Sequence, residues 1–344
     1  MRLRTGLGVL PLGPGELQIG LDPRWAVRLT GLTEPETSAL LAAGSGTPLP
    51  GTPPGVSRPR WAGLLEDLRT ASLAHDVPAR APLTTGEADA QAWDLADPRR
   101  PGRERVAARR GRAVVVDGLG PTGLCLAVAL AGAGVGTVAV ADDTPVRAAD
   151  VGPGGYRWTD VGAPRARVAA RVLHDAAPAV TVAPPAGDPD LVVLIDTGAA
   201  DPVRASCLVS AQIPHLSVVL GEAGATVGPL VGTHSGPCLH CLDLHRTDHD
   251  PRWSEVVTRL STSRGRSVAE AGVTAGTAGH LAASLVLTYL DGDRRPVPTT
   301  WEITLPDPIP QARTWEPHPR CACSGQATSG RRRAGGEPIA VRTR

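Results

Sequence analysis

The sequence predicts an α/β protein in which a small N-terminal α+β domain precedes a larger domain built on a parallel sheet. Between residues 113 and 220, short β-branched runs alternate with helical segments, and this βαβ alternation is typical of parallel strands. A glycine-rich loop, 118–123, joins the first of these strands directly to a helix. Two close pairs of cysteines follow, at 238 and 241 and at 321 and 323, so we expect a zinc-bearing C-terminal part.

The composition excludes several classes of function. All 35 basic side chains among the 344 residues are arginines, because the chain contains no lysine. A Walker-type phosphate loop, a Schiff base and a pyridoxal anchor each need the ε-amine of lysine, so these classes are excluded. The formal net charge is +1, and without a strong basic field we expect neither nucleic acid nor a membrane as partner.

Two uncharged runs, 118–141 and 271–290, are long enough to span a bilayer. The first holds six glycines and the second contains Thr274, Thr277 and His280, so we interpret both as core of a soluble protein. Glycines and prolines interrupt the N-terminal stretch, and we expect no signal peptide. We therefore expect a cytoplasmic protein, in which cysteines indicate a metal or free thiols before disulfides.

Residues 1–80 predict strands followed by two helices. Apolar and polar residues alternate over 15–32 on both sides of a turn at 22–24, which indicates two short strands. Thr33 and Glu36 form a capping box at the start of the first helix. Four large apolar residues then recur with helical spacing and predict the second helix: Trp61, Leu64, Leu65 and Leu68.

Residues 81–106 are rich in Asp, Arg and Pro and show little periodicity, so we expect a linker that becomes helical near 103–110. The larger domain extends over 107–325 and alternates strands at 113–117, 137–141, 190–196, 214–220 and 301–305 with helices at 121–133, 165–174 and 268–290. The Gly/Arg-rich residues 326–344 have too little apolar surface to order themselves, and we expect a disordered tail.

The loop from residue 118 to 123, Gly-Leu-Gly-Pro-Thr-Gly, has the glycine spacing of a phosphate-binding turn. Gly118 allows the tight turn, Gly120 lets the backbone approach a phosphate, and Gly123 lets the helix pack on the strand. Asp142 follows the next strand, where it can accept hydrogen bonds from a ribose. Together they predict a nucleotide site, whereas glycines that serve packing alone would predict the same fold.

Further phrases resemble the ThiF/E1-like superfamily over residues 107–325. They are Ala133-Gly134-Val135-Gly136, Asp142 with Val146, Gly162-Ala163-Pro164-Arg165, and the strand from Asp190 to Asp196. Members of this superfamily, the ubiquitin-like modifier-activating enzymes among them, use ATP to adenylate the C-terminus of a small protein or peptide. The resemblance implies a Rossmann-like domain with ATP and Mg²⁺ as cofactors, held by Gly118, Gly120, Gly123, Asp142, Arg165 and Asp196. Asp196 would bind the magnesium, and it and Arg165 would be catalytic in an active enzyme.

The sequence departs from the family pattern at several positions. Asp150 stands where the family has asparagine, Pro153-Gly154 occupies its Arg-Gln pair, and Arg165 replaces its lysine. The missing arginine would stabilise the departing pyrophosphate, and loss of one such donor costs roughly 10²- to 10³-fold in rate, unless Arg147 or Arg157 takes its place. These departures predict a degenerate nucleotide site.

Cys238-Leu239-His240-Cys241 and Cys321-Ala322-Cys323 supply four thiols in two close pairs. Such pairs suit one tetrahedral zinc ion, and the superfamily resemblance implies a structural zinc here. A redox CxxC and a pair of disulfides stay open as alternatives. Five histidines of the region could each replace a cysteine as ligand: His234, His240, His245, His249 and His318. We interpret Cys125 and Cys207 as small core residues, and only family analogy makes Cys207 a thioester-forming nucleophile.

Longer phrases at 225–231, 237–246, 248–253 and 315–323 look like the E1-like partner proteins of actinobacterial peptide natural-product pathways. In those systems a winged-helix-like N-terminal domain binds the leader segment of a precursor peptide as an added strand, and the E1-like domain often lacks a working ATP site. The resemblance implies such a domain over 1–80, a cyclodehydratase as modifying partner, and a homodimer. Alternatively, the N-terminal domain only dimerises or covers the sheet.

Two functions therefore stay open. The first is a scaffold that binds a precursor peptide or small protein and presents it to a modifying enzyme in ribosomal peptide natural-product biosynthesis. The second is an active ATP-dependent adenylyltransferase of the ubiquitin-like modifier-activating type. An NAD(P)-dependent oxidoreductase is disfavoured by the cysteine pairs and the ThiF-like phrases. The predicted fold is common to both functions and does not distinguish them.

Overall fold

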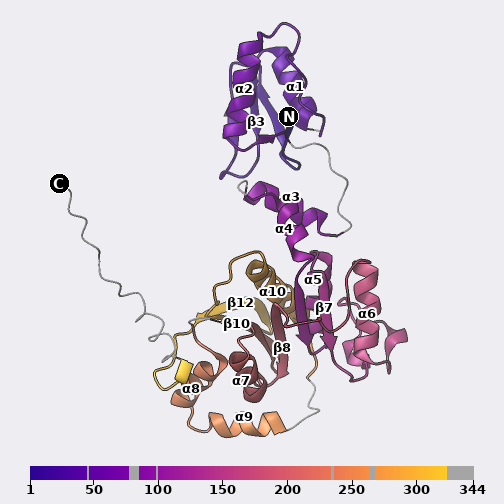
Figure 1. Ribbon diagram of the computed structural model, residues 1–344, viewed down its shortest axis with the longest axis vertical. Helices are drawn as coiled ribbons and strands as arrows, with labels where there is room; N and C mark the ends of the chain where they lie inside the picture. Colours follow the sequence, from indigo (N-terminus) through magenta and orange to yellow (C-terminus); the bar gives the residue numbers. More distant parts are fainter. Residues whose placement is uncertain (45, 77–84, 98–99, 234–235, 263–267, 324–344) are drawn as a thin grey trace, which may run out of the picture. The chain divides into compact units, whose positions relative to one another are not determined.

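The computed structural model describes residues 1–44, 46–76, 85–97, 100–233, 236–262 and 268–323 (Figure 1). The tail expected over 326–344 lies outside the described residues. The chain divides into two compact units, Met1–Ala107 and Ala108–Arg344. Each unit is described by itself.

The smaller unit contains a three-stranded antiparallel sheet in the order β2-β3-β4, formed by Val9–Gly13, Glu16–Ile19 and Val27–Leu29. Strands β3 and β4 are the two strands expected between residues 15 and 32. Two short strands, β1 (Arg2–Leu3) and β5 (Ala74–His75), pair separately. Strand β2 was not foreseen, because Pro11 interrupts its alternation; proline is tolerated there because β2 is an edge strand.

Helices α1 (Glu34–Gly44) and α2 (Arg58–Thr70) are the two helices expected for this unit. One half of the capping box is present, since the Thr33 backbone N–H donates to the Glu36 carboxylate at 2.7 Å. The Thr33 hydroxyl also donates to this carboxylate, at 2.9 Å. The core of the unit is formed by side chains from the sheet and both helices, among them Leu17, Ile19, Leu40, Trp61 and Leu68. A strand and helix content of this kind agrees with an α+β domain, and the winged-helix class stays a prediction.

Two helices lie between residues 85 and 109: α3 (Glu87–Ala96) and α4 (Gly102–Arg109). The helical end of the 81–106 segment was expected, whereas the helix over 87–96 was not, and the role of 81–106 as a linker stays a prediction. The two helices approach closely, because a Cβ at Gly102 would lie 2.0 Å from the Ala90 carbonyl oxygen. The Arg105 guanidinium also stacks 4.0 Å from the Trp93 ring centroid. This tertiary contact, and no local periodicity, stabilises α3.

The larger unit is built on a seven-stranded sheet in the order β12-β11-β10-β9-β8-β6-β7. Four strands are parallel, as expected: β6 (Ala113–Asp117), β7 (Thr137–Ala141), β8 (Leu191–Thr197) and β9 (His215–Leu220). The remaining three are antiparallel, which corrects the expectation of a wholly parallel sheet: β10 (Gly224–Val231), β11 (Thr299–Thr304) and β12 (Asp307–Thr314). The turns before β10 and β12 are too short for the crossover that parallel strands need.

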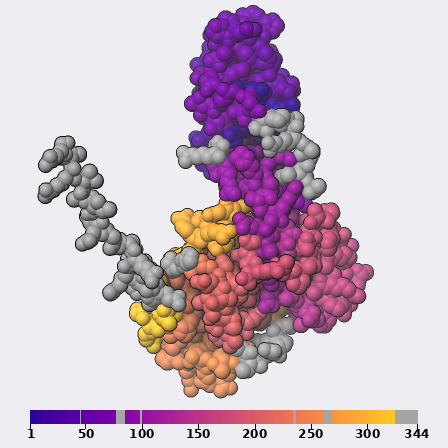
Figure 2. All heavy atoms as spheres, viewed as in Figure 1, coloured from indigo at the N-terminus to yellow at the C-terminus, as the bar shows by residue number. Residues whose placement is uncertain are grey.

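Six helices accompany this sheet in the described part of the chain: α5 (Pro121–Gly132), α6 (Arg165–Ala176), α7 (Pro202–Ser210), α8 (Leu239–His249), α9 (Trp253–Thr262) and α10 (Gly272–Leu290). Two short 3₁₀ helices, η1 (Ala148–Asp150) and η2 (Trp158–Asp160), precede α6. The last described segment, yellow in Figure 2, contacts α8, because His318 Nε2 lies 2.8 Å from the Asp248 carboxylate.

Helix α10 is long and apolar enough to cross a membrane by length and composition, and it is the one described helix that is. Its small residues pack directly on α5: a Cβ at Gly279 would lie 2.9 Å from the Thr122 carbonyl oxygen and from the Cys125 Cβ. Ala278, Ala282 and Val286 are fully buried in the core of the larger unit. The helix therefore has the packing expected of a core element.

Candidate functional site

The glycine loop connects β6 to α5 as the sequence predicts. Gly118 has φ +110°, and a Cβ there would lie 2.9 Å from the Ile195 carbonyl oxygen. A Cβ at Gly123 would lie 2.0 Å from the Gly118 carbonyl oxygen. Both positions therefore require glycine, Gly118 for its backbone conformation and Gly123 because the first turn of α5 packs on the loop.

A carboxylate from elsewhere in the chain lies on this loop. The Thr122 backbone N–H donates to Glu270 Oε2 at 2.9 Å, and a Cβ at Gly120 would lie 2.1 Å from Glu270 Oε1. Burial raises the pKa of Glu270 above its ordinary value. The sequence contained no signal for this contact, because Glu270 and Thr122 are 148 residues apart and the glutamate belongs to no motif.

Asp142, the expected ribose ligand, also faces the loop. Its Oδ2 accepts the Leu119 backbone N–H at 2.9 Å and the Arg165 guanidinium at 3.1 Å. Burial opposes ionisation of Asp142, but hydrogen bonds from Thr144, Leu119 and Arg165 lower its pKa below the ordinary value. This carboxylate is consequently charged and already paired.

Two guanidinium groups, those of Arg147 and Arg165, contact the Asp150 carboxylate. It is buried and accepts hydrogen bonds from Arg147 at 2.7 Å and from Arg165 Nε at 3.1 Å. Burial opposes its ionisation, yet the contacts with Arg147 and Arg165 lower its pKa. Arg165 therefore bridges Asp142 and Asp150, and its positive charge is balanced within the protein.

These groups surround a cavity of about 340 Å³. The structure brings together four of the expected nucleotide ligands at its wall: Gly118, Gly120, Asp142 and Arg165. Arg147 lines it as well, which is one of the two arginines considered as substitutes for the one missing at Pro153. Arg157 instead precedes η2, where its backbone N–H donates to Asp160 at 2.9 Å. Gly123 lies behind the loop as a packing residue.

Asp196, the expected magnesium ligand, is placed differently from the other candidates. Side chains alternate along β8, and its neighbours Ile195 and Thr197 are the ones that line the cavity. The Asp196 carboxylate pairs with Arg204 and accepts the Asp201 backbone N–H at 3.2 Å. Burial raises the pKa of Asp196, and Arg204 opposes this shift.

A second cavity, of about 240 Å³, lies beside the first and shares Glu270 as a lining residue. Cys125 and His280 also line it, with Cys125 Sγ 3.3 Å from His280 Nδ1. The same Nδ1 lies 2.8 Å from the Gly276 carbonyl oxygen, which only an N–H can approach favourably, so Nδ1 carries a proton and does not activate the thiol. Burial also raises the pKa of Cys125 above its ordinary value, which disfavours the reactive thiolate form.

The two cysteines outside the quartet differ in environment. Cys125 is buried, as expected for a core residue, whereas Cys207 on α7 is exposed. The interpretation of Cys207 as a core residue is therefore wrong. The surrounding sequence is apolar, but α7 buries Ala205 and leaves Cys207 and Val209 exposed.

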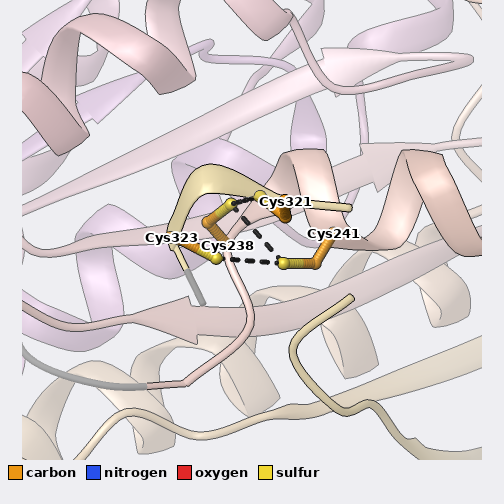
Figure 3. Close-up of side chains that lie close together, drawn as sticks. All are labelled: Cys238, Cys241, Cys321 and Cys323. Atoms are coloured by element: carbon orange, nitrogen blue, oxygen red, sulfur yellow. Dashed lines mark hydrogen bonds between the residues drawn. The ribbon is translucent and has the colours of Figure 1, made fainter. Parts of the chain in front are cut away.

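The four cysteines of the two pairs converge (Figure 3). Their Sγ atoms all lie within 4.8 Å of one another, at 3.8 Å for Cys238 to Cys241, 3.6 Å for Cys238 to Cys321 and 3.1 Å for Cys241 to Cys323. Sulfurs bound to one tetrahedral ion at about 2.3 Å lie roughly 3.8 Å apart, so this arrangement fits a metal. All four cysteines are free thiols, far from the S–S length of about 2.05 Å.

Elements far apart in the chain position these thiols. Cys238 is the N-cap residue of α8 and Cys241 lies in its first turn, while the other pair follows β12. Burial raises the pKa of Cys238 to about 11, so a bound cation would be needed to hold the thiolate form. The cluster packs with its own small apolar core, which includes Leu239, Leu242 and Trp315.

The histidines considered as substitute ligands lie outside this group, as far as the chain is described. His318 Nε2 contacts Asp248 at 2.8 Å and His245 Nε2 contacts the Glu316 carbonyl oxygen at 2.9 Å. His240 and His249 are on α8 but are not part of the thiol cluster. His234 lies outside the described residues. Among the described candidates, the ligand set therefore consists of the four cysteines.

Comparison with known proteins gives one family and one fold. A family model described as the ThiF family matches residues 96–324. No curated protein matches the chain. Similar solved structures include E. coli MccB with MccA-N7isoASN (TM-score 0.64, 14% identity, 94% of this chain and 99% of that chain) and E. coli MccB with ATP (0.63, 14%, 94% and 98%). The structure of PaaA is also similar (0.64, 17%, 90% and 98%).

Proposed function

The chain belongs to the ThiF family, and on that premise we propose that it binds a precursor peptide and presents it to a modifying enzyme in peptide natural-product biosynthesis. The observation that carries this proposal is the open three-stranded sheet of the smaller unit. Its two outer strands, β2 and β4, pair on one side only among the described residues. An extended peptide can add to such an edge through main-chain hydrogen bonds.

The two edges are not equivalent. Pro11 lies in β2 and contributes no N–H, and proline on an edge strand hinders pairing with a further strand. Strand β4, Val27–Leu29, has no proline, and Val27 and Leu29 pack against the core while Arg28 is exposed. We therefore assign the peptide to the β4 edge.

The comparisons support a peptide or small protein as partner. The similar MccB structures align with 94% of this chain, so the likeness includes the smaller unit, and one of them contains MccA-N7isoASN. Identity of 14% supports a common fold, and the step from that fold to a peptide ligand is part of the proposal.

We also propose that the nucleotide site of this protein is degenerate and does not support ATP-dependent catalysis. Pro153-Gly154 supplies no cation where the family has Arg-Gln, and Asp142, Asp150, Arg147 and Arg165 pair with one another around the cavity. The Asp196 carboxylate is engaged by Arg204 and Asp201. These contacts partly neutralise the charges that the same groups would otherwise offer to Mg-ATP, and they occupy part of the hydrogen-bonding capacity of the carboxylates.

An active ATP-dependent adenylyltransferase is the second candidate. It is favoured by the glycine loop, which keeps all three glycines, and by Arg147 at the cavity wall. In that case the peptide carboxylate would attack the α-phosphate of ATP and release pyrophosphate. ATP-dependent pyrophosphate exchange, stimulated by the peptide, would establish this function and overturn the degenerate site.

We further propose that the four cysteines bind one structural zinc ion. A closed set of four thiolates leaves no open position for a substrate, so the zinc would stabilise the fold and take no part in catalysis. A homodimer, a cyclodehydratase as the modifying partner and a cytoplasmic location are proposed on the family likeness. Sedimentation equilibrium tests the dimer, and co-purification with the modifying enzyme tests the partner.

Peptide binding is tested with the full-length protein. The probe is the synthetic leader segment of a candidate precursor peptide, labelled with a fluorophore and followed by anisotropy. Hydrogen exchange then locates the contact: β4 amides should gain protection on binding, and β2 amides, which serve as the internal control, should not. Saturable binding without added protection at β4 would overturn the assignment to that edge, and no binding would overturn the proposed function.

A further inference from the structure

The carboxylate of Glu270 lies where an anionic ligand of the glycine loop would be expected to bind. Helix α5 begins at Pro121, which has no N–H, so the Thr122 N–H is the first hydrogen-bond donor of the helix. Glu270 Oε2 accepts that N–H at 2.9 Å, and Oε1 lies against the Cα side of Gly120. The N-terminus of a helix favours negative charge, because its free N–H groups and dipole point toward it.

The other groups that could attract a phosphate here, the Leu119 N–H and the Arg165 guanidinium, already contact carboxylates of the protein. Asp142 takes the Leu119 N–H at 2.9 Å, and Arg165 lies between Asp142 and Asp150. A phosphate bound at the glycine loop would therefore lie near two carboxylates, Asp142 and Glu270, which line the same cavity. Two like charges in contact repel strongly when water is excluded.

We propose that Glu270 is a built-in occupant of the anion site of the glycine loop and that it keeps nucleotide phosphates out of the cavity. This inference rests on the part of the proposed function that treats the cavity as a degenerate nucleotide site. It names the residue that closes the site, by charge and by occupied volume. Leu220 and Val268 give the same cavity apolar lining, so the exclusion concerns phosphates and not a neutral nucleoside.

The test is calorimetric titration of the full-length protein and two variants, Glu270→Gln and Glu270→Ala. The probes are Mg-ATP, inorganic pyrophosphate and adenosine. Glu270→Gln removes the charge and keeps the volume, whereas Glu270→Ala removes both. Glu255→Gln is the matched control, because Glu255 on α9 is an exposed carboxylate paired with Arg259.

Affinity for pyrophosphate and Mg-ATP should rise at least about 100-fold in Glu270→Ala, with a smaller rise in Glu270→Gln, because a contact repulsion between unit charges is removed. Adenosine binding should change little in either variant, and Glu255→Gln should match the parent protein. Thermal unfolding of each variant verifies the fold, and Glu270→Gln serves alone if Glu270→Ala does not fold.

Three outcomes would overturn the inference: tight ATP binding by the parent protein, no gain of pyrophosphate affinity in either folded variant, or an equal gain for adenosine. Leader-peptide anisotropy is measured on the same proteins as a separate readout. If the Glu270 variants gain no affinity for pyrophosphate while the leader peptide still binds, this inference alone is rejected. If the variants gain affinity for pyrophosphate but no protein binds the leader peptide, the proposed function alone is rejected.

Discussion

Arg204 pairs with Asp196 and also contacts Asp117, so one guanidinium joins the ends of β6 and β8. Asp196 is buried, while Arg204 is about one third exposed, at 35%. The pair explains why a conspicuous aspartate at the end of a parallel strand does not face the glycine-loop cavity. Its carboxylate serves the start of α7, where it also accepts the Asp201 N–H.

Replacement of Arg204 by methionine should destabilise the larger unit by about 1–3 kcal/mol, because it leaves the buried Asp196 carboxylate without its cation. The measurement is urea unfolding followed by near-UV circular dichroism. Arg259→Met, which breaks an exposed i,i+4 pair with Glu255, is the control and should cost less than about 0.5 kcal/mol. Equal losses of unfolding free energy in the two variants would show that the Arg204 pair stabilises the protein no more than an exposed ion pair does.

Replacement of Cys238 by alanine should remove the bound zinc and at least about 3 kcal/mol of stability together, because metal binding contributes to folding free energy. Metal content by mass spectrometry and thermal unfolding provide the two readouts. Cys207→Ala, an exposed thiol outside the cluster, should keep both the metal and the unfolding temperature. Full stability and unchanged metal in Cys238→Ala would contradict a four-thiolate site.

Glu36 makes the smaller unit sensitive to acid. Its hydrogen bonds with Arg60 lower the pKa of Glu36 to about 2 against the opposing effect of burial. A lowered pKa gives stability that is complete above the ordinary value near 4.5 and is lost as the pH falls toward 2. At neutral pH, Glu36→Gln should therefore cost up to about 3 kcal/mol.

The difference between Glu36→Gln and the parent protein should shrink steadily below pH 4.5. Unfolding of the smaller unit, followed by hydrogen exchange of the β3 and α1 amides, gives the measurement. Glu34→Gln, an exposed carboxylate in the same turn of α1, should show little pH-dependent difference. A constant cost from pH 7 to pH 3 would exclude the charged carboxylate as the cause.

Gly123→Ala should destabilise the larger unit by about 2–4 kcal/mol. The new methyl group would meet the Gly118 carbonyl oxygen, which is a backbone atom and cannot rotate away as a side chain can. Gly132→Ala in the same helix is the matched control, since its Cβ would meet nothing within 4 Å. That change should be neutral or stabilising by up to about 1 kcal/mol. Similar behaviour of the two variants, measured by chemical unfolding, would contradict the close loop packing.

Local pattern was sufficient for most elements of the structure. Strands β6 to β9, helices α1, α2, α5 and α6, and the contact of Thr33 with Glu36 all follow from residues a few positions apart. Helix α3 was missed because its stability comes from packing on α4, and Cys207 was misplaced because local composition does not decide which helix face is buried. The ThiF family was also predicted from short phrases, and the family match over 96–324 confirms it.

The sequence by itself determined the glycine loop, the cysteine quartet and the family, because each depends on residue types at fixed short spacings. Only the tertiary structure decided which polar groups meet: the Glu270 carboxylate with the Thr122 N–H, Arg165 with Asp150, and Arg204 with Asp196. It also decided the antiparallel pairing of β10, β11 and β12. Contacts between distant segments arise when the whole core packs and buried charges find partners, and no short-range pattern encodes that choice.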